Sequence, residues 1–305
     1  MPAEPVHVVT GAFGFTGRFI TRRLLSMGVR VKTLTRTPAR TNPFGDRLTV
    51  AAYNFENPGA LARSLEGAAV LYNTYWVRFP HGRTTFEAAI ANTRTLLRAC
   101  EEAGVPRIVH VSVTNAATDS PLPYYRGKGL VEEAIKRSSL TYAILRPPLI
   151  FGPGDILVNN IAWFLRRFPI FTVMGDGHYR LQCLFAEDFA ETAIACASRQ
   201  DRGVVDVVGP ETFSFDEFVR LIADTIGSRA RIVHLSSHTV RGLLGLVGRV
   251  IRDVVLTPDE IAGLMSGLLV TQSPPLGRTR FRDWLGGVAG TLGRTYASEL
   301  ARHYR

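Results

Sequence analysis

The sequence predicts an α/β protein in which a doubly wound parallel sheet is followed by a smaller, mostly helical C-terminal domain. The first observation is a series of apolar, β-branched runs at 6–10, 29–35, 48–53, 68–74, 107–113 and 140–146. The second is the presence of helix-period segments between several of these runs, notably 83–103 and 126–138. Strands that alternate with helices of this length form right-handed βαβ units, so the sheet is parallel and covered on both faces.

The helix ends and the later elements have local signals of their own. Gly28 and Gly104 each follow a helical stretch, where a C-terminal cap belongs. After RPPLIFGPGD at 146–155, prolines and glycines interrupt the alternation. A helix at 187–199 and a short strand at 203–208 are predicted to return to the sheet.

Beyond Pro210 the sequence predicts mainly helices. Ser214 and Glu217 form a capping box, and Gly227 closes the helix that they begin. A second helix start is predicted from Thr257, Pro258 and Glu260.

Composition and charge narrow the classes of function. The 305-residue chain has a net charge of +10, and residues 1–152 hold 19 Lys and Arg against 10 Asp and Glu. No run of consecutive basic residues stands out, which argues against a nucleic-acid partner, whereas a diffuse positive field suits a small anionic ligand. Cysteines 100, 183 and 196 lie among apolar neighbours and match no metal-ligand spacing, so we predict core residues and no metal site.

The chain carries no sequence signal for export or membrane insertion. Its N-terminus has no basic region followed by an apolar stretch, and its apolar stretches are interrupted well before the ~20 residues of a membrane span. We therefore expect a cytoplasmic protein without a transmembrane segment. Its oligomeric state is not predicted.

The stretch VVTGAFGFTG at 8–17 ends the first strand and begins a helix. Glycine at such a turn lets a pyrophosphate approach the backbone amides, and a later glycine lets the helix pack close to the sheet. The pattern predicts a Rossmann-like dinucleotide-binding domain at 1–152, with 187–210 returning to it, and a substrate-binding domain at 153–186 and 211–305. The predicted cofactor contacts of the turn are Thr10, Gly11, Phe13, Gly14, Phe15, Thr16 and Gly17.

The end of the second strand favours NADP over NAD. An NAD site usually has an acidic residue there for the ribose 2′-hydroxyl. Here the strand ends at Thr35-Arg36, and no Asp or Glu occurs between Glu4 and Asp46. Arg36, together with Arg40, suits a 2′-phosphate through charge-assisted hydrogen bonds, so NADP is the preferred cofactor and NAD the alternative.

Tyr124 precedes Lys128 by four residues, on one face of a predicted helix start. A phenol beside an ammonium has its phenolate form favoured, so it can exchange a proton with a carbonyl or hydroxyl group. Ser112 and Thr114, just after the fifth strand, offer hydroxyls that could polarise the same oxygen. Tyr125 has no lysine at this spacing and is predicted to be a packing residue.

Several motifs together carry a family resemblance: TGAFGFTG at 10–17, the asparagine of IANTRTLLRACEEAGV, VHVSVTN at 109–115, YYRGK at 124–128, LRPPLIFGPGD at 145–155, FAEDFAE at 185–191 and VVGPETFSFDEFVRLIA at 207–223. The chain resembles the extended or atypical short-chain dehydrogenases/reductases of the epimerase/dehydratase and NmrA-like type, over nearly all of its length. Within that family it is similar to the nucleotide-binding accessory subunit of respiratory complex I and its bacterial relatives.

The resemblance implies roles for the residues at the matching positions. Tyr124 is expected to be the acid/base, with Lys128 contacting the nicotinamide ribose and Thr114 or Ser112 as the hydroxyl partner. Further cofactor contacts are expected at Asn54 and Phe55 after the third strand, at Asn73, Thr74 and Tyr75 after the fourth, and at Pro147, Leu149 and Ile150 after the sixth.

The chain departs from the family pattern where the pocket is expected. Asn54-Phe55 replaces the usual Asp-Leu, and Tyr75-Trp76 ends the fourth strand where relatives have small residues. Thr114 is followed by Asn115 rather than by acidic residues, so dehydratase activity is not expected. Asp188 resembles a structural helix-start residue. The candidate substrate residues are Trp76, Asn159, Asn160, Trp163, His178, Tyr179 and Gln182, most of which could equally support the fold.

Residues 239–256 form an apolar stripe interrupted by arginines. The simplest interpretation is a helix packed on the substrate domain, and the alternatives are a lid for a hydrophobic substrate or an interfacial helix that touches a membrane or a protein partner.

Three functions are consistent with the sequence. The leading hypothesis is an NADP-dependent oxidoreductase that transfers hydride to or from a small-molecule carbonyl or alcohol. The alternatives are an NAD-dependent sugar-nucleotide epimerase, and a non-catalytic nucleotide-binding sensor or assembly subunit.

Overall fold

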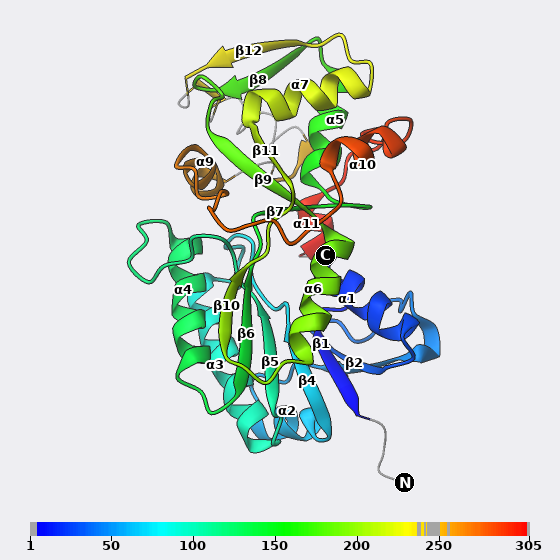
Figure 1. Cartoon of the computed structure of the whole chain (residues 1–305), viewed down its shortest axis with the longest axis vertical. Coiled ribbons are helices and arrows are strands. Elements are labelled where there is room, and N and C mark those ends of the chain that lie inside the picture. The colour runs from blue at the N-terminus through cyan, green and yellow to red at the C-terminus, as the bar shows by residue number, and fades with distance from the viewer. Residues whose placement is uncertain (1–4, 237–238, 241, 243–250, 255–256, 304–305) are drawn as a thin grey trace. The chain divides into compact units, whose positions relative to one another are not determined.

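The structure, a computed structural model, describes residues 5–236, 239–240, 242, 251–254 and 257–303 (Figure 1). The chain divides into two compact units, one of Met1–Pro147 with Ala186–Val207 and one of Pro148–Phe185 with Val208–Arg305. The units change after Pro147, Phe185 and Val207, which lie five, one and three residues before the predicted boundaries at 152, 186 and 210.

The first unit is built on a seven-stranded sheet in which every strand pair is parallel. Its strands are β1 (Val6–Thr10), β2 (Arg30–Thr35), β3 (Leu48–Ala52), β4 (Ala68–Asn73), β5 (Arg107–Val111), β6 (Thr141–Arg146) and β10 (Gly203–Asp206). Their order is β10-β6-β5-β4-β1-β2-β3. The predicted α/β class and doubly wound parallel sheet are therefore confirmed, with each predicted strand of this sheet in place.

Helices cover both faces of this sheet (Figure 1). One face carries α1 (Phe15–Ser26) and α6 (Ala186–Ala197), and the other carries α2 (Pro58–Leu65), α3 (Phe86–Glu102) and α4 (Pro123–Lys136). A 3₁₀ turn, η1 (Gly45–Arg47), precedes β3. The core under α2, α3 and α4 includes Val8, Leu71, Ile108 and Ile144, which are all fully buried. The apolar strand residues thus explain why the sheet is sandwiched between helices.

Strand order reverses between β1 and β4, since β2 and β3 lie beyond β1 while β5, β6 and β10 lie beyond β4. In open parallel sheets, ligands bind at the carboxyl ends of the strands beside such a switch point. The glycine turn that follows β1 lies at this position.

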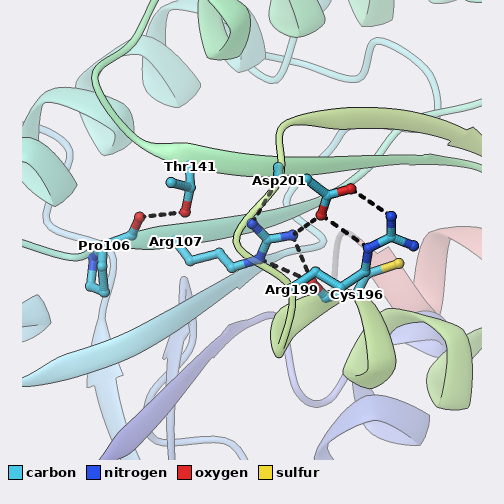
Figure 2. Close-up of polar contacts among 6 residues, drawn as sticks. All are labelled: Pro106, Arg107, Thr141, Cys196, Arg199 and Asp201. Atoms are coloured by element: carbon cyan, nitrogen blue, oxygen red, sulfur yellow. Dashed lines mark hydrogen bonds and ion pairs between the residues drawn. The ribbon is translucent and has the colours of Figure 1, made fainter.

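Arg107 fixes the returning segment 186–207 to the sheet (Figure 2). Its side chain is only 3% exposed, and its guanidinium donates to Cys196 O at 2.9 and 2.6 Å and to Asp201 O at 2.9 Å. Asp201 also pairs with Arg199 at the surface. The buried Arg107 thus donates to one carbonyl group in the last turn of α6 and to one in the loop that follows, and it links both to β5.

The second unit contains small sheets and short helices. The strands β7 (Leu149–Phe151), β9 (Arg180–Phe185) and β11 (Glu211–Ser214) form one sheet, and β8 (Ile170–Met174) pairs with β12 (Arg231–Leu235). Its helices include α5 (Leu157–Arg167), α7 (Phe215–Thr225), α9 (Pro258–Met265), α10 (Phe281–Val288) and α11 (Glu299–His303). Phe151, Phe218 and Phe281 lie in its core.

The predicted helix caps and buried cysteines are present in the structure. Capping boxes are present at Ser214/Glu217 and Thr257/Glu260, as predicted. Gly28, Gly104 and Gly227 follow α1, α3 and α7 with positive φ, and all three cysteines are buried. The five short strands of the second unit were not predicted, because their partners are distant in sequence. Within the residues that the structure describes, no helix is long and apolar enough to cross a membrane.

Candidate functional site

The turn between β1 and α1 has the geometry of a phosphate cradle. Gly11 has a φ of +68°, and its amide donates to Leu34 O at 2.9 Å. Gly14 is the N-cap of α1, and no side chain caps the first amides of this helix. A Cβ at Gly17 would lie 2.2 Å from Gly11 O, so only glycine allows α1 to approach the turn so closely. The half-buried side chains of Phe13, Phe15 and Thr16 flank the cradle in sequence.

A row of buried polar side chains joins the carboxyl ends of β1, β4 and β5. Thr10 Oγ1 accepts from the amides of Thr74 at 2.8 Å and Tyr75 at 3.0 Å, and donates to Asn73 Oδ1 at 3.2 Å. Asn73 Nδ2 donates to His110 Nδ1 at 3.1 Å. Burial, reinforced by the nearby Lys128 ammonium, holds the pKa of His110 well below its usual range, so its ring is neutral. These bonds fix the segment after β4 beside the glycine turn.

Three aromatic rings form a cluster next to the end of β2. Tyr53 stacks on Phe55 with ring centroids 4.8 Å apart, and Tyr75 lies 5.2 Å from each of them. Asn92 donates to the Tyr75 hydroxyl at 2.8 Å. Burial raises the pKa of both tyrosines, and the Arg36 guanidinium acts in the opposite direction on each.

At the end of β2, the side chain of Arg36 is exposed to solvent. Thr35 is buried, Arg36 is exposed, and Asn54 is exposed with a φ of +49°. The arginine that the sequence assigned to a 2′-phosphate therefore lies near Tyr53 and Tyr75, on the same side of the unit as the cradle.

Tyr124 and Lys128 both lie on α4, one turn apart. Tyr124 is half-buried, and its ring lies edge-on to Trp76 and Phe86, with centroids 6.1 and 6.0 Å away. Lys128 is 3% exposed, its Nζ donates to Val111 O at 2.7 Å, and the ammonium lies 4.6 Å from the centroid of the Trp76 ring.

The environment of Lys128 changes its acidity. Burial lowers the pKa of its ammonium to about 7, with the Glu132 carboxylate opposing this shift. The residue can therefore change protonation state near neutral pH. Tyr125, on the next position of α4, is buried as the packing prediction requires.

The two candidate hydroxyl partners have different surroundings. The Ser112 hydroxyl donates to Glu132 Oε1 at 2.5 Å, so its proton is already used within the protein. Thr114 is fully buried, and its amide donates to Pro147 O at 3.1 Å. Leu149 and Ile150, which were assigned with Pro147 to the cofactor, begin β7 in the second unit.

The predicted substrate residues of the second unit hold its own chain together. Asn159 Nδ2 donates to Thr295 O, and Asn160 exchanges hydrogen bonds with the main chain of Ala297. Gln182 Oε1 accepts from the amide of Thr271. These contacts favour the fold-supporting alternative for the three amide side chains.

The other predicted substrate residues of this unit are aromatic. The ring of Trp163 lies 5.2 Å from that of Tyr296 and 5.8 Å from that of Phe168. Tyr179 stacks on Phe215 with ring centroids 5.4 Å apart. His178 is exposed. Most of the apolar stripe at 239–256 lies outside the described residues, so its interpretations stay predictions.

Sequence reasoning did not single out Glu132, Arg146 or His110. Glu132 is 1% exposed and forms an ion pair with Arg146, and His110 belongs to the polar row at the strand ends. The spacing in the sequence could have indicated Glu132, because it follows Lys128 by four residues and therefore shares its helix face.

Comparison with known proteins agrees with this geometry. Residues 11–153 match a family described as NAD(P)H-binding. A ceramide reductase of Caulobacter vibrioides is 28% identical over 238 residues, which is 76% of this chain and 74% of that protein. The chain is thus similar to extended short-chain dehydrogenases/reductases of the NmrA-like type. The NAD(P)H-binding match spans the glycine turn, Tyr124 and Lys128 and supports a nicotinamide cofactor.

Two further proteins are similar to this chain. It is 27% identical over 243 residues to the mitochondrial NADH dehydrogenase [ubiquinone] 1 alpha subcomplex subunit 9 of Arabidopsis thaliana, covering 75% of this chain but only 60% of that protein. The triphenylmethane reductase of Citrobacter sp. complexed with NADP(H) has the same fold, with a TM-score of 0.74 and 17% identity over 93% of this chain and 99% of that one.

Proposed function

We propose that this protein is an NADP(H)-dependent enzyme that interconverts a carbonyl group and an alcohol, with Tyr124 as acid/base. The observation that carries the proposal is that Tyr124 and the buried Lys128 lie one turn apart on one helix, at the carboxyl edge of the sheet. Lys128 Nζ contacts the last residue of β5, so the pair lies where parallel sheets bind ligands.

The residues present fit a dinucleotide. The uncapped first turn of α1 supplies amide donors for a pyrophosphate, and the side-chain-free cradle of Gly11, Gly14 and Gly17 leaves room for it. Arg36, on an N-terminal segment without carboxylates from residue 5 to 45, supports a 2′-phosphate and hence NADP. When bound, the nicotinamide donates or accepts the hydride.

The protein's own groups handle the proton. The Tyr124 hydroxyl gives a proton to the substrate oxygen in reduction and takes it back in oxidation. The Lys128 ammonium, on the same helix face, favours the phenolate that results. Thr114 donates a second hydrogen bond to the same oxygen, while Ser112 stays bound to Glu132.

The similarity to proteins named as reductases, one of them complexed with NADP(H), supports this proposal. One observation favours a second candidate, a nucleotide-binding subunit without turnover. The Lys128 ammonium already contacts Val111 O and the Trp76 ring, which leaves fewer of its donors for a cofactor. The similarity to a complex I subunit is consistent with that alternative.

Replacement of Tyr124 by Phe tests the proposal. Tyr124→Phe removes one hydroxyl and almost no volume, so fold and NADPH affinity should be retained while turnover falls by about 10²–10⁴. The assay follows NADPH absorbance with a panel of aldehydes and ketones, and Tyr125→Phe is the matched control. Full activity of Tyr124→Phe would exclude this mechanism. Tight NADPH binding by a wild-type protein that reduces and oxidises none of the panel would favour the second candidate.

A further inference from the structure

Glu132 is a buried carboxylate whose two oxygens are both used by neighbouring elements. Ser112 Oγ, just after β5, donates to Oε1 at 2.5 Å. Arg146, at the end of β6, donates through Nε to Oε1 at 2.9 Å and through Nη2 to Oε2 at 2.5 Å. Glu132 itself lies on α4 and is 1% exposed. One side chain therefore joins a helix to the ends of two strands.

Packing alone does not explain why a carboxylate occupies this position. Val131 and Ile135, on the same helix, are fully buried in the apolar core of the first unit. Replacing a buried ion pair by apolar side chains of similar volume is often neutral or stabilising, because burying two charges costs much of what their attraction contributes. The reason for Glu132 is better sought in the groups that it places.

Glu132 holds together the two elements that carry Thr114 and Lys128 of the proposed catalytic site. The segment 111–118, which carries Thr114, contacts α4 at several points. Lys128 Nζ donates to Val111 O, Glu132 accepts from Ser112, and Arg146 Nη2 donates to Ala116 O at 3.4 Å. Gly129 lies so close to this segment that a Cβ there would be 2.5 Å from Ala117 C. The segment and the helix are thus held together around one carboxylate.

We propose that Glu132 is a positioning residue: its carboxylate fixes the Thr114 segment against α4, and its negative charge lies one helical turn from Lys128 on the same helix, where it favours the ammonium form. This inference rests on the proposed function for the roles of Thr114, Tyr124 and Lys128. Among the described residues, the ionisable groups near Lys128 include Glu132 and Tyr124 on its own helix and the neutral His110 on β5.

The test compares Glu132→Gln with Glu133→Gln. Glutamine keeps the shape and acceptor oxygen of Glu132 but removes its charge. Glu133 is the next residue on α4 and pairs with Lys136 at the surface, so its replacement changes the net charge equally without touching the network. A third variant, Ser112→Ala/Glu132→Leu/Arg146→Met, replaces the whole network by apolar groups and guards against an unpaired Arg146.

The first measurement is the titration of Lys128 itself. The chain has three lysines, at 32, 128 and 136, so ¹³C-lysine labelling gives three side-chain signals that Lys32→Arg and Lys136→Arg assign. Removing an anion destabilises the protonated form, so the titration midpoint of Lys128 should fall by about one pH unit in Glu132→Gln. The apolar variant also removes the Arg146 cation, so its midpoint should fall less. The midpoint should not move in Glu133→Gln.

The second measurement is hydrogen exchange of the amides at 112–118, which should accelerate about tenfold or more in Glu132→Gln and in the apolar variant but not in Glu133→Gln. In an active enzyme, the alkaline limb of the pH–rate profile should shift down with the Lys128 midpoint. An unchanged Lys128 midpoint in Glu132→Gln, or unchanged exchange in Glu132→Gln and the apolar variant, would overturn the proposal. Both NMR measurements are made without turnover, so altered values in a protein that shows no activity would contradict the proposed function and leave the role of Glu132 supported.

Discussion

At the scale of single residues, side chains with different chemical roles lie around one end of the first unit's sheet. Arg36 at the end of β2 acts electrostatically on Tyr53 and Tyr75, whereas Lys128 is buried against Val111 O and Trp76. A solvated cation keeps its charge, and a buried one loses it more easily. The exposed arginine therefore suits a permanent phosphate contact, and the buried lysine suits a step in which charge changes.

Arg36→Ala should identify the 2′-phosphate contact. A lost charge-assisted hydrogen bond should weaken NADPH binding about 10–100-fold while NADH affinity hardly changes. Titration calorimetry with both cofactors measures this. Arg47→Ala, a change of equal charge in the turn before β3, is the control and should affect neither cofactor. Equal NADPH and NADH affinity in the wild-type protein would contradict the preference.

At the scale of elements, the fit between β1 and α1 depends on the absence of a side chain at one position. The Cβ of any other residue at 17 would lie 2.2 Å from Gly11 O and 2.8 Å from Gly11 C, and both atoms are backbone. A flexible side chain could move aside, but the turn itself must shift here. The cradle for the phosphates and the close packing of α1 are therefore one structural feature.

Gly17→Ala should open this turn. We expect NADPH affinity to fall at least about tenfold and stability to fall by about 1–3 kcal/mol, while far-UV circular dichroism stays near native. Gly286→Ala in α10 is the matched control, since no atom lies within 4 Å of its Cβ position and alanine is the better helix former. A Gly17→Ala protein that binds NADPH as tightly as wild type would place the phosphate contact elsewhere.

At the scale of the whole molecule, the chain leaves its first unit after Pro147 and returns at Ala186. The returning segment contributes α6 and the edge strand β10, which pairs with β6. Arg107, on β5, donates hydrogen bonds to the carbonyl oxygens of Cys196 and Asp201 in this returning segment. The first unit is therefore complete only when two distant parts of the sequence have assembled.

Arg107→Met should weaken that assembly. It removes three hydrogen bonds from a buried guanidinium to the carbonyl oxygens of Cys196 and Asp201, so urea denaturation should give a loss of about 2–4 kcal/mol in the free energy of unfolding. Amides of β10 and of the last turn of α6 should exchange faster. Arg199→Met removes an exposed partner of the same Asp201 and should have a much smaller effect. Equal losses in the two variants would show that the buried contacts of Arg107 contribute little.

Features that depend on local patterns could be predicted from the amino-acid sequence. Alternating apolar runs predicted the strands of the parallel sheet, glycine spacing predicted the cradle, and capping boxes predicted the starts of α7 and α9. Tyr124 and Lys128 were found because they lie one helical turn apart. In each case the physical cause acts over a few residues, so neighbours along the chain carry the signal.

Features that depend on distant partners became visible in the folded chain and not before. The Ser112–Glu132–Arg146 network, the Thr10–Asn73–His110 row and the Arg107 contacts all join residues of different elements. The structure likewise showed that Asn159, Asn160 and Gln182 bond to the main chain of their own unit. A side chain's burial and hydrogen-bond partners are set by the packing of elements far apart in sequence, and no local pattern encodes them.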